Sequence, residues 1–139
     1  MKYLLLLNRA TDALPEPGTP AAQAMLREYT AAVQAMAEAG ALVDCAPLTA
    51  ASAATTVRVR DGQPLLTDGP AAELREQVGG YAIIDCPDLD DALKWAAAMP
   101  AARDCSVEVR AIVDVGAGNP GAGNPGSANA RGGHPRSGR

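Results

Sequence analysis

The residues best suited to chemistry lie between Asp68 and Tyr81. Asp68 opens an Asp-Gly-Pro turn, Glu73 follows five residues later, and Tyr81 begins a short apolar run. A carboxylate such as Asp68 at the mouth of a pocket can act as a general acid or base. The alternative is structural, because Asp can cap the backbone of a turn that Gly69 and Pro70 shape. These residue types therefore allow Asp68 to be either a proton carrier or a turn former.

Arg9 follows an apolar run at the start of the chain and could meet an anionic ligand, or it could be an ordinary surface arginine. Tyr81 could direct its hydroxyl into a pocket or fill the sheet. Gly79-Gly80 could allow a ligand close to the backbone or form a bulge at the start of a strand. The predicted cleft has Arg9 at its rim and is lined by Asp68, Gly69, Pro70, Glu73 and Tyr81.

Histidine is missing from residues 1–114, since His134 is the single histidine of the chain. This excludes His-assisted nucleophilic catalysis in that segment and makes a His-bound metal unfavourable. The cysteines are odd in number and lack CxxC spacing, so we interpret them as reduced thiols. With neither a phosphate-binding loop nor a dinucleotide fingerprint, we expect no metal and no cofactor.

The pattern of apolar residues predicts strands and helices in a fixed order. Thr19-Pro20 and Asp88 are typical helix starts, and Gly40 and Pro100 are typical stops. Alternation over 55–60, the Asp61-Gly62 turn and a returning strand predict a hairpin. We predict strands at 1–8, 41–46, 81–84 and 106–115, helices at 20–39 and from 89, and the hairpin at 55–67.

Without the hairpin this order is βαββαβ, which predicts a ferredoxin-like α+β fold with an inserted β-hairpin. Both helices would cover one face of an antiparallel sheet. The other face is apolar enough to need a cover, so we predict a partner surface there. The domain is expected at 1–115. Residues 116–139, rich in Gly, Pro, Asn and Arg, are expected to form a disordered tail.

Several blocks of this chain resemble the YCII-related family, in its DGPF branch. The blocks occur in order: Asp68-Gly69-Pro70, Glu73, Arg75-Glu76-Gln77, Gly79-Gly80-Tyr81, Leu89 to Ala96 and Ser106 to Arg110. Ala71 departs from the branch, which has Phe there. The resemblance covers residues 1–114 and implies a dimeric α+β barrel, in which a second subunit closes the open sheet face. It therefore supports a homodimer.

The function that follows from the resemblance is open. Members of the wider family carry a proposed His–Asp active pair, which residues 1–114 cannot supply. The first hypothesis is a small-molecule-binding accessory protein of unknown ligand, linked through the resemblance to extracytoplasmic-function sigma factors. The alternative is a small-molecule enzyme that uses Asp68 as its general acid or base. The missing histidine favours the first hypothesis.

Charge and hydropathy limit the partners. Residues 1–114 hold nine basic and sixteen acidic side chains, so their formal charge is near −7. Such a surface disfavours nucleic acid and anionic membranes as partners. The apolar run from Tyr3 stops at Asn8, far short of the roughly 20 residues of a membrane span, and does not fit a signal peptide. We expect a cytoplasmic protein, and the Ala-, Arg- and Gly-rich usage suggests a bacterial source.

Overall fold

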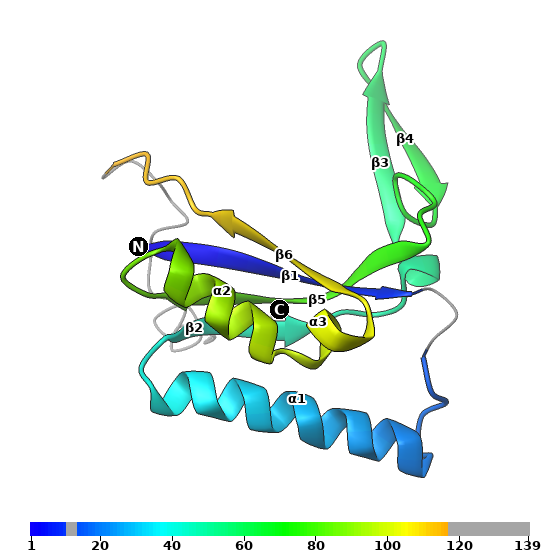
Figure 1. Ribbon diagram of the computed structural model, residues 1–139. Helices are drawn as coiled ribbons and strands as arrows, with labels where there is room; N and C mark the ends of the chain where they lie inside the picture. The colour runs from blue at the N-terminus through cyan, green and yellow to red at the C-terminus, as the bar shows by residue number, and fades with distance from the viewer. Residues whose placement is uncertain (11–13, 117–139) are drawn as a thin grey trace, which may run out of the picture.

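A computed structural model describes residues 1–10 and 14–116. Its main body is a four-stranded antiparallel sheet in the order β2-β5-β1-β6 (Figure 1). The elements of this body are β1 (Lys2–Ala10), α1 (Pro20–Glu38), β2 (Leu42–Pro47), β5 (Glu76–Asp85), α2 (Leu89–Ala98), α3 (Pro100–Asp104) and β6 (Ser106–Ala111). A short 3-10 turn, η1 (Ala51–Ala53), precedes the hairpin of β3 (Thr55–Arg60) and β4 (Gln63–Asp68).

This strand order confirms the ferredoxin-like prediction. The chain runs β1, α1, β2, β5, α2 and β6 around the sheet, and the hairpin is inserted between β2 and β5. The family blocks therefore fall on one α+β unit. The predicted disordered tail, apart from Gly116, lies outside the described residues.

Both long helices start and stop as their capping residues predict. The Thr19 hydroxyl accepts a hydrogen bond from the Ala22 amide at 3.3 Å, and Pro20 occupies the first turn of α1. The Asp88 carboxylate accepts from the Asp91 amide at 2.9 Å at the start of α2. Gly40, with a φ of 72°, ends α1 in the left-handed conformation that glycine adopts without strain.

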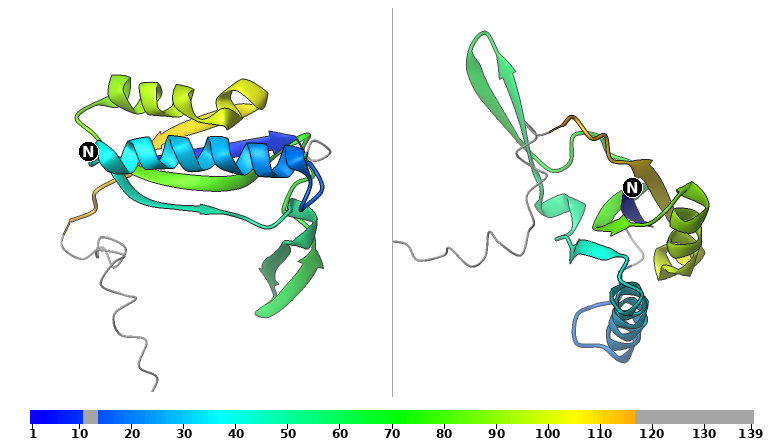
Figure 2. Two further views of the ribbon diagram at one scale, coloured as in Figure 1. Left: turned by 90° about the horizontal axis from the view of Figure 1, so that it is seen from below. Right: turned by 90° about the vertical axis from the view of Figure 1, so that its left-hand side faces the viewer.

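The helices share one side of the sheet, and the hairpin rises on the other side (Figure 2). Strand alternation sends every second residue of β1 and β5 towards the helices. These residues form the core with buried side chains of α1 and the α2–α3 region. The core members are Tyr3, Leu5, Leu7, Met36, Ala82, Ile84, Cys86, Ala92, Ala96, Met99 and Ala101.

Several predicted element bounds were wrong, and the first strand runs to Ala10 rather than ending at Asn8. β5 begins at Glu76 rather than Tyr81, because β1 continues to Ala10 and supplies a pairing partner for residues 76–78. Residues 100–104 form the short helix α3 where a connector was predicted, helped by Pro100 in its first turn. β6 ends at Ala111, since β1 begins at Lys2 and leaves the later residues without a strand to pair with.

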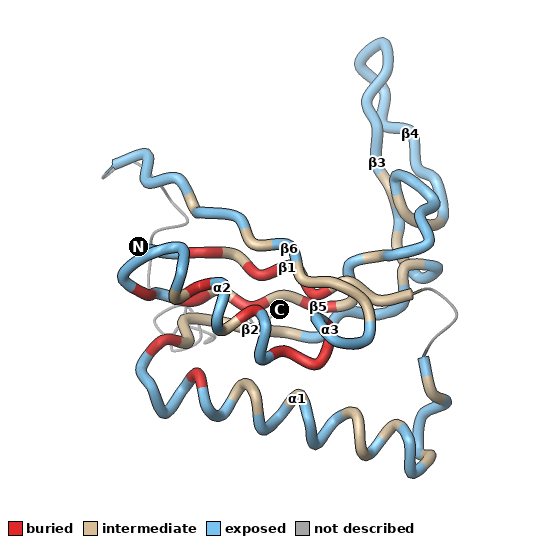
Figure 3. The backbone as a smooth tube through the Cα atoms, viewed as in Figure 1, coloured by how far each residue is buried: buried red, intermediate tan, exposed pale blue. Residues whose placement is uncertain are grey.

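The β3–β4 hairpin is a separate two-stranded ribbon that extends away from the body (Figure 1). Its turn residues Asp61 and Gly62 have φ angles of 52° and 73°, as a tight two-residue hairpin turn requires. Almost the whole ribbon is exposed (Figure 3). The prediction of an inserted hairpin is therefore confirmed, but the ribbon does not fold over the sheet.

Gly80 allows β2 to approach β5 closely. A Cβ atom at this position would lie 3.0 Å from the Ala46 carbonyl oxygen and 3.5 Å from the Pro47 Cα. We expect Gly80→Ala to lower the free energy of unfolding by about 1–3 kcal/mol, because backbone atoms cannot move aside cheaply. Urea denaturation measures this change.

Gly79→Ala is the matched control for that substitution. The nearest atoms there belong to the flexible Arg9 side chain, with Cζ at 3.2 Å, so the loss of stability should be smaller. Equal losses for the two variants would show that the close approach of β2 at Gly80 does not limit the packing.

Candidate ligand-binding pocket

A pocket of about 710 Å³ opens between α1 and the sheet. Its walls are mostly aliphatic, and they come from α1 on one side and from β1, β2 and β5 on the other. The lining residues are Leu7, Arg9, Ala22, Met25, Leu26, Tyr29, Thr30, Val33, Gln34, Cys45, Ala46, Pro47, Gly79, Gly80, Tyr81, Ala82 and Met99.

The pocket exists because the sheet presents small side chains to α1. Gly80, Ala82 and Cys45 face the helix layer, as their paired positions on β2 and β5 require. The apolar stripe of α1, including Met25 and Val33, is too distant to fill the remaining space.

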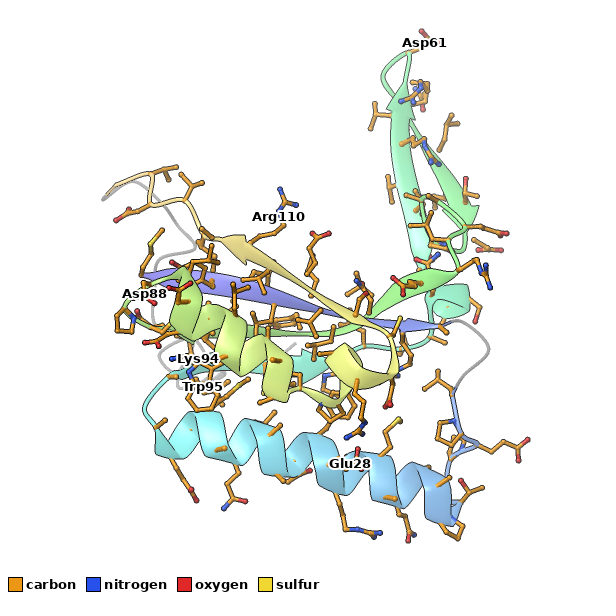
Figure 4. All side chains as sticks on the ribbon, in the orientation of Figure 1. Glu28, Asp61, Asp88, Lys94, Trp95 and Arg110 are labelled. Atoms are coloured by element: carbon orange, nitrogen blue, oxygen red, sulfur yellow. The ribbon has the colours of Figure 1, made fainter. Side chains whose placement is uncertain are left out.

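Contacts elsewhere along the helix hold α1 at this distance. Met36 is fully buried near the C-terminal end of α1. Midway along the helix, the Arg103 guanidinium of α3 lies 2.6 Å from the Glu28 carboxylate, which points towards α3 (Figure 4). Both side chains are largely exposed, so this ion pair contributes orientation more than stability.

Arg9 is the cationic group of the pocket. It is half-buried and lies across Gly79, and it also borders a smaller pocket of about 110 Å³ next to η1. The register of β1 against β5 shifts after Leu7, so Gly79 forms a bulge, as one of the two sequence interpretations predicted. Across residues 1–10 and 14–116, the guanidinium of Arg9 takes part in no ion pair.

Other polar side chains of the pocket are either hydrogen-bonded within α1 or uncharged. The Thr30 hydroxyl donates to the Leu26 carbonyl at 2.8 Å, and the Gln34 amide donates to Glu38 at 3.2 Å. Burial, and then the neighbouring Asp44 carboxylate, raise the pKa of the Cys45 thiol. Cys45 is therefore a protonated thiol at neutral pH rather than an activated nucleophile.

Tyr81 borders the pocket, but its ring belongs to the other face of the sheet. Its hydroxyl donates to the Asp44 carboxylate at 2.9 Å, and Asp44 pairs across the strands with Ile83 on that face. The hydrogen bond to Asp44, followed by burial, raises the pKa of Tyr81. The residue thus connects the floor of the pocket with the open sheet face.

The Asp-Gly-Pro turn lies at the base of the hairpin, outside this pocket. Asp68 is exposed and pairs with Thr55. Gly69 has a φ of 96°, its amide donates to the Ala54 carbonyl at 2.7 Å, and its carbonyl accepts from the Thr56 hydroxyl at 2.8 Å.

The structure does not bring the predicted cleft together. It brings Arg9 and Tyr81 to the pocket, and leaves Asp68, Gly69, Pro70 and Glu73 outside both pockets. The turn-forming role of Gly69 is visible in its backbone bonds. A catalytic role for Asp68 stays a prediction.

Sequence reasoning missed that the α1 stripe borders a pocket. Met25, Tyr29 and Val33 lie on the apolar stripe of an amphipathic helix, and such a stripe normally packs directly into the core. The available signal was the set of small residues Gly79, Gly80 and Ala82, which leaves nothing bulky opposite such a stripe.

A second polar cluster joins β1, β5 and the start of β6. The Glu76 carboxylate accepts hydrogen bonds from the Cys105 thiol and the Ser106 hydroxyl, each at 3.0 Å. The Asn8 amide donates to the Ser106 hydroxyl at 3.1 Å. The bonds from Cys105 and then Ser106 lower the pKa of Glu76, and the same carboxylate raises the pKa of Cys105.

In the part of the chain that the structure describes, no three His, Cys, Asp or Glu side chains come together as a metal-binding group. None of the helices in that part has the length and apolar character of a membrane span.

Comparison with known proteins identifies the family. The YCII-related domain matches residues 1–116. The chain belongs to the YCII-related family. An uncharacterized protein of Rhizobium meliloti (strain 1021) is 40% identical over 72 residues, which cover 52% of this chain and 58% of that protein. The match thus spans less than two thirds of the relative.

A solved structure is also similar to this YCII-related chain. It is 5-chloro-2-hydroxyhydroquinone dehydrochlorinase (TftG) from Burkholderia phenoliruptrix, in complex with 2,5-dihydroxybenzoquinone. The TM-score is 0.41 at 14% sequence identity, and the alignment covers 81% of this chain and 94% of that chain. The family resemblance expected from the sequence is confirmed by the domain match.

The charged Glu76 carboxylate stabilises the folded state of this YCII-related protein, and acid removes that stabilisation. Because the folded state lowers the pKa of Glu76 below its usual value of 4.5, the stabilisation is present above that value and is lost as pH falls through the folded pKa. We expect Glu76→Gln to reduce unfolding free energy at pH 6–7 and to converge with the wild type at acidic pH. Urea denaturation at several pH values measures this difference.

Glu73→Gln is the control for the pH series. Glu73 is exposed on the loop before β5, outside the cluster with Cys105 and Ser106. It should change stability little at either end of the range. A Glu76→Gln difference that is independent of pH would contradict the role of the charged carboxylate.

Proposed function

We propose that this protein binds a small apolar molecule that carries an anionic group, such as an aromatic or aliphatic carboxylate. The observation that carries the proposal is the Arg9 guanidinium, half-buried across Gly79 at an aliphatic pocket. Arginine recognises carboxylates through paired, charge-assisted hydrogen bonds, which strengthen where water is partly excluded.

The size and lining of the pocket support a small organic ligand. Its volume of about 710 Å³ lies within the range of roughly 300–1,000 Å³ that is usual for such sites. Apolar walls from α1 and β5 would bury the body of the ligand, while Arg9 fixes its charged end. Tyr29, half-buried beside the core, adds an aromatic surface on the α1 side.

The groups around the pocket are better suited to binding a ligand than to acid–base catalysis. They include a guanidinium, a protonated thiol, the Tyr29 phenol, and the Thr30 and Gln34 side chains, which are already engaged in local hydrogen bonds. We therefore propose an accessory protein whose signal is ligand occupancy. The family resemblance supports, as part of this proposal, a role beside an extracytoplasmic-function sigma factor.

The ligand proposal is tested with 2-naphthoate, an aromatic carboxylate, and with its neutral amide. We expect Arg9→Gln to weaken naphthoate binding about tenfold, because a hydrogen-bonded charge pair contributes roughly 1.5 kcal/mol or more. The affinity for the amide should stay the same. Isothermal titration calorimetry gives both dissociation constants.

Two further variants locate the site. Val33→Trp should fill the pocket from α1 and abolish binding of both probes. Asp68→Asn lies outside the pocket and should leave both affinities unchanged. If Asp68→Asn weakened binding and Arg9→Gln did not, the site would be the Asp-Gly-Pro turn, and the enzyme hypothesis would regain its basis.

We also propose that two copies associate through the open face of the sheet. The central strands present Leu4, Leu6, Tyr81 and Ile83 on this face, opposite the helix layer. These side chains are half-buried in the single chain, although none of the helices in the described residues covers them. An uncovered apolar sheet face of this kind is typical of a subunit interface.

A charge placed at the centre of the open face tests the assembly. We expect Ile83→Glu to raise the dimer dissociation constant by more than about tenfold, because an unpaired carboxylate would be buried. Leu93→Glu is the control, since Leu93 is a 47% exposed side chain of α2 on the helix side. Sedimentation equilibrium measures both, and a wild-type chain that stays monomeric at micromolar concentration would refute the dimer.

A further inference from the structure

One face of the β3–β4 ribbon is apolar beyond the Thr55–Asp68 pair at its base. Cross-strand pairing places Val57 opposite Leu66 and Val59 opposite Pro64, all on the same side of the ribbon. Their side chains are strongly exposed, with 59% of Val57, 60% of Val59 and 69% of Leu66 accessible to solvent. Four aliphatic side chains therefore form a continuous surface in water.

The opposite face of the ribbon is polar and is partly covered by its own chain. Thr56 and Arg58 alternate with the valines, so they point to this second side. The Thr56 hydroxyl donates to the Gly69 carbonyl at 2.8 Å, and the Arg58 guanidinium donates to the Ala71 carbonyl at 3.2 Å. The loop after β4 thus covers the polar face and leaves the apolar face bare.

Such a ribbon needs external support. An isolated two-stranded hairpin is at best marginally stable in water, and three or more strands or a packed surface are usually required. Exposed apolar side chains of this size also mark contact surfaces. Nothing within residues 1–10 and 14–116 covers the Val57–Val59 side, so its partner must come from another molecule or another part of the chain.

The direction of the ribbon favours a second copy of this chain. It extends from the side of the sheet opposite α1, which is the side of the open face (Figures 1 and 2). Arg110, which pairs with Leu4 on that face, points to the same side (Figure 4). A chain bound to the open face would therefore lie beside the ribbon.

Charge complementarity favours the same partner. Arg58 and Arg60 of the ribbon form no ion pair with any of the described carboxylates. Residues 1–114 are acidic overall, with sixteen acidic against nine basic side chains. Asp61 and Asp68 make the ribbon neutral as a whole, but Arg58 and Arg60 stand on its polar face and can pair at the edges of the ribbon with acidic side chains of another copy.

We propose that the β3–β4 ribbon is an arm that packs its face of Val57, Val59, Pro64 and Leu66 against a second copy of this chain. The inference rests on the dimer proposed above and assigns to it a contact outside the sheet. In the dimer, the arm of each chain lies against the partner, and the ribbon gains the packing surface that it lacks alone.

Adjacent leucines of β4 provide a matched test. Leu66→Lys changes the apolar face, whereas Leu65→Lys makes the same substitution on the polar face of the same ribbon, at a side chain that is 50% exposed. We expect Leu66→Lys to raise the dimer dissociation constant about tenfold or more in sedimentation equilibrium. Leu65→Lys should change it less than about threefold.

Hydrogen exchange tests the arm without altering it. The backbone amides of residues 55–60, 63 and 65–68 should exchange more slowly as the wild-type concentration rises through the dimer dissociation constant. In the monomeric Ile83→Glu variant they should exchange fast at every concentration.

The outcomes separate the arm from the dimer. If the wild type is a dimer but Leu66→Lys behaves like Leu65→Lys, or ribbon exchange is independent of concentration, the arm is refuted while the open-face dimer stands. A monomeric wild type refutes both. A ligand-binding result for Arg9 bears on neither.

Discussion

The fold depends on β1, a central strand that is apolar on both of its faces. Leu5 and Leu7 are buried against the helices, whereas Leu4 and Leu6 point to the open side and stay half-buried. A strand of continuous leucines normally belongs to a sheet that is covered on both sides. Within residues 1–10 and 14–116 the helices cover one face only, since α1, α2 and α3 all lie on one side. The other face is therefore the main reason to propose an assembly, and the ribbon rises on that side.

The same helix layer accounts for the pocket, because α1 covers the sheet but does not fill the space between them. Gly80 brings β2 close to β5, but it also removes a side chain that could have packed beneath α1. Ala82 and Cys45 continue this shallow floor, while α1 is fixed by Met36 and by the ion pair of Glu28 with α3. Space of this kind forfeits packing energy in the empty protein. A ligand that fills it restores those contacts and stabilises the folded state by mass action.

Capping residues and turn sequences predicted most of the fold, because they act on neighbouring residues. The site depends mostly on contacts between elements that are far apart in the sequence. Thr19, Asp88 and the Asp61-Gly62 turn act within a few residues, so the elements that they define were predicted correctly. The pocket depends instead on which residues of α1 meet which residues of the sheet, and alternation or helical period alone does not specify this. The position of Arg9 depends on a bulge at Gly79, for which the sequence supported two interpretations. Asp68 was predicted to line a cleft with Tyr81 and Arg9, but its ribbon extends away from the body.

β5 joins the proposed binding site to the proposed interface. Successive residues of a strand point to opposite sides of the sheet. Gly80 and Ala82 therefore border the pocket, while the side chains of Tyr81 and Ile83 lie on the open face. The hydrogen bond from Tyr81 to Asp44 ties this strand to β2, which supplies Cys45 to the pocket wall. A shift of β5 by a partner would therefore also alter the pocket. If dimerisation changes the ligand affinity by some factor, thermodynamic linkage requires the ligand to change the dimer affinity by the same factor.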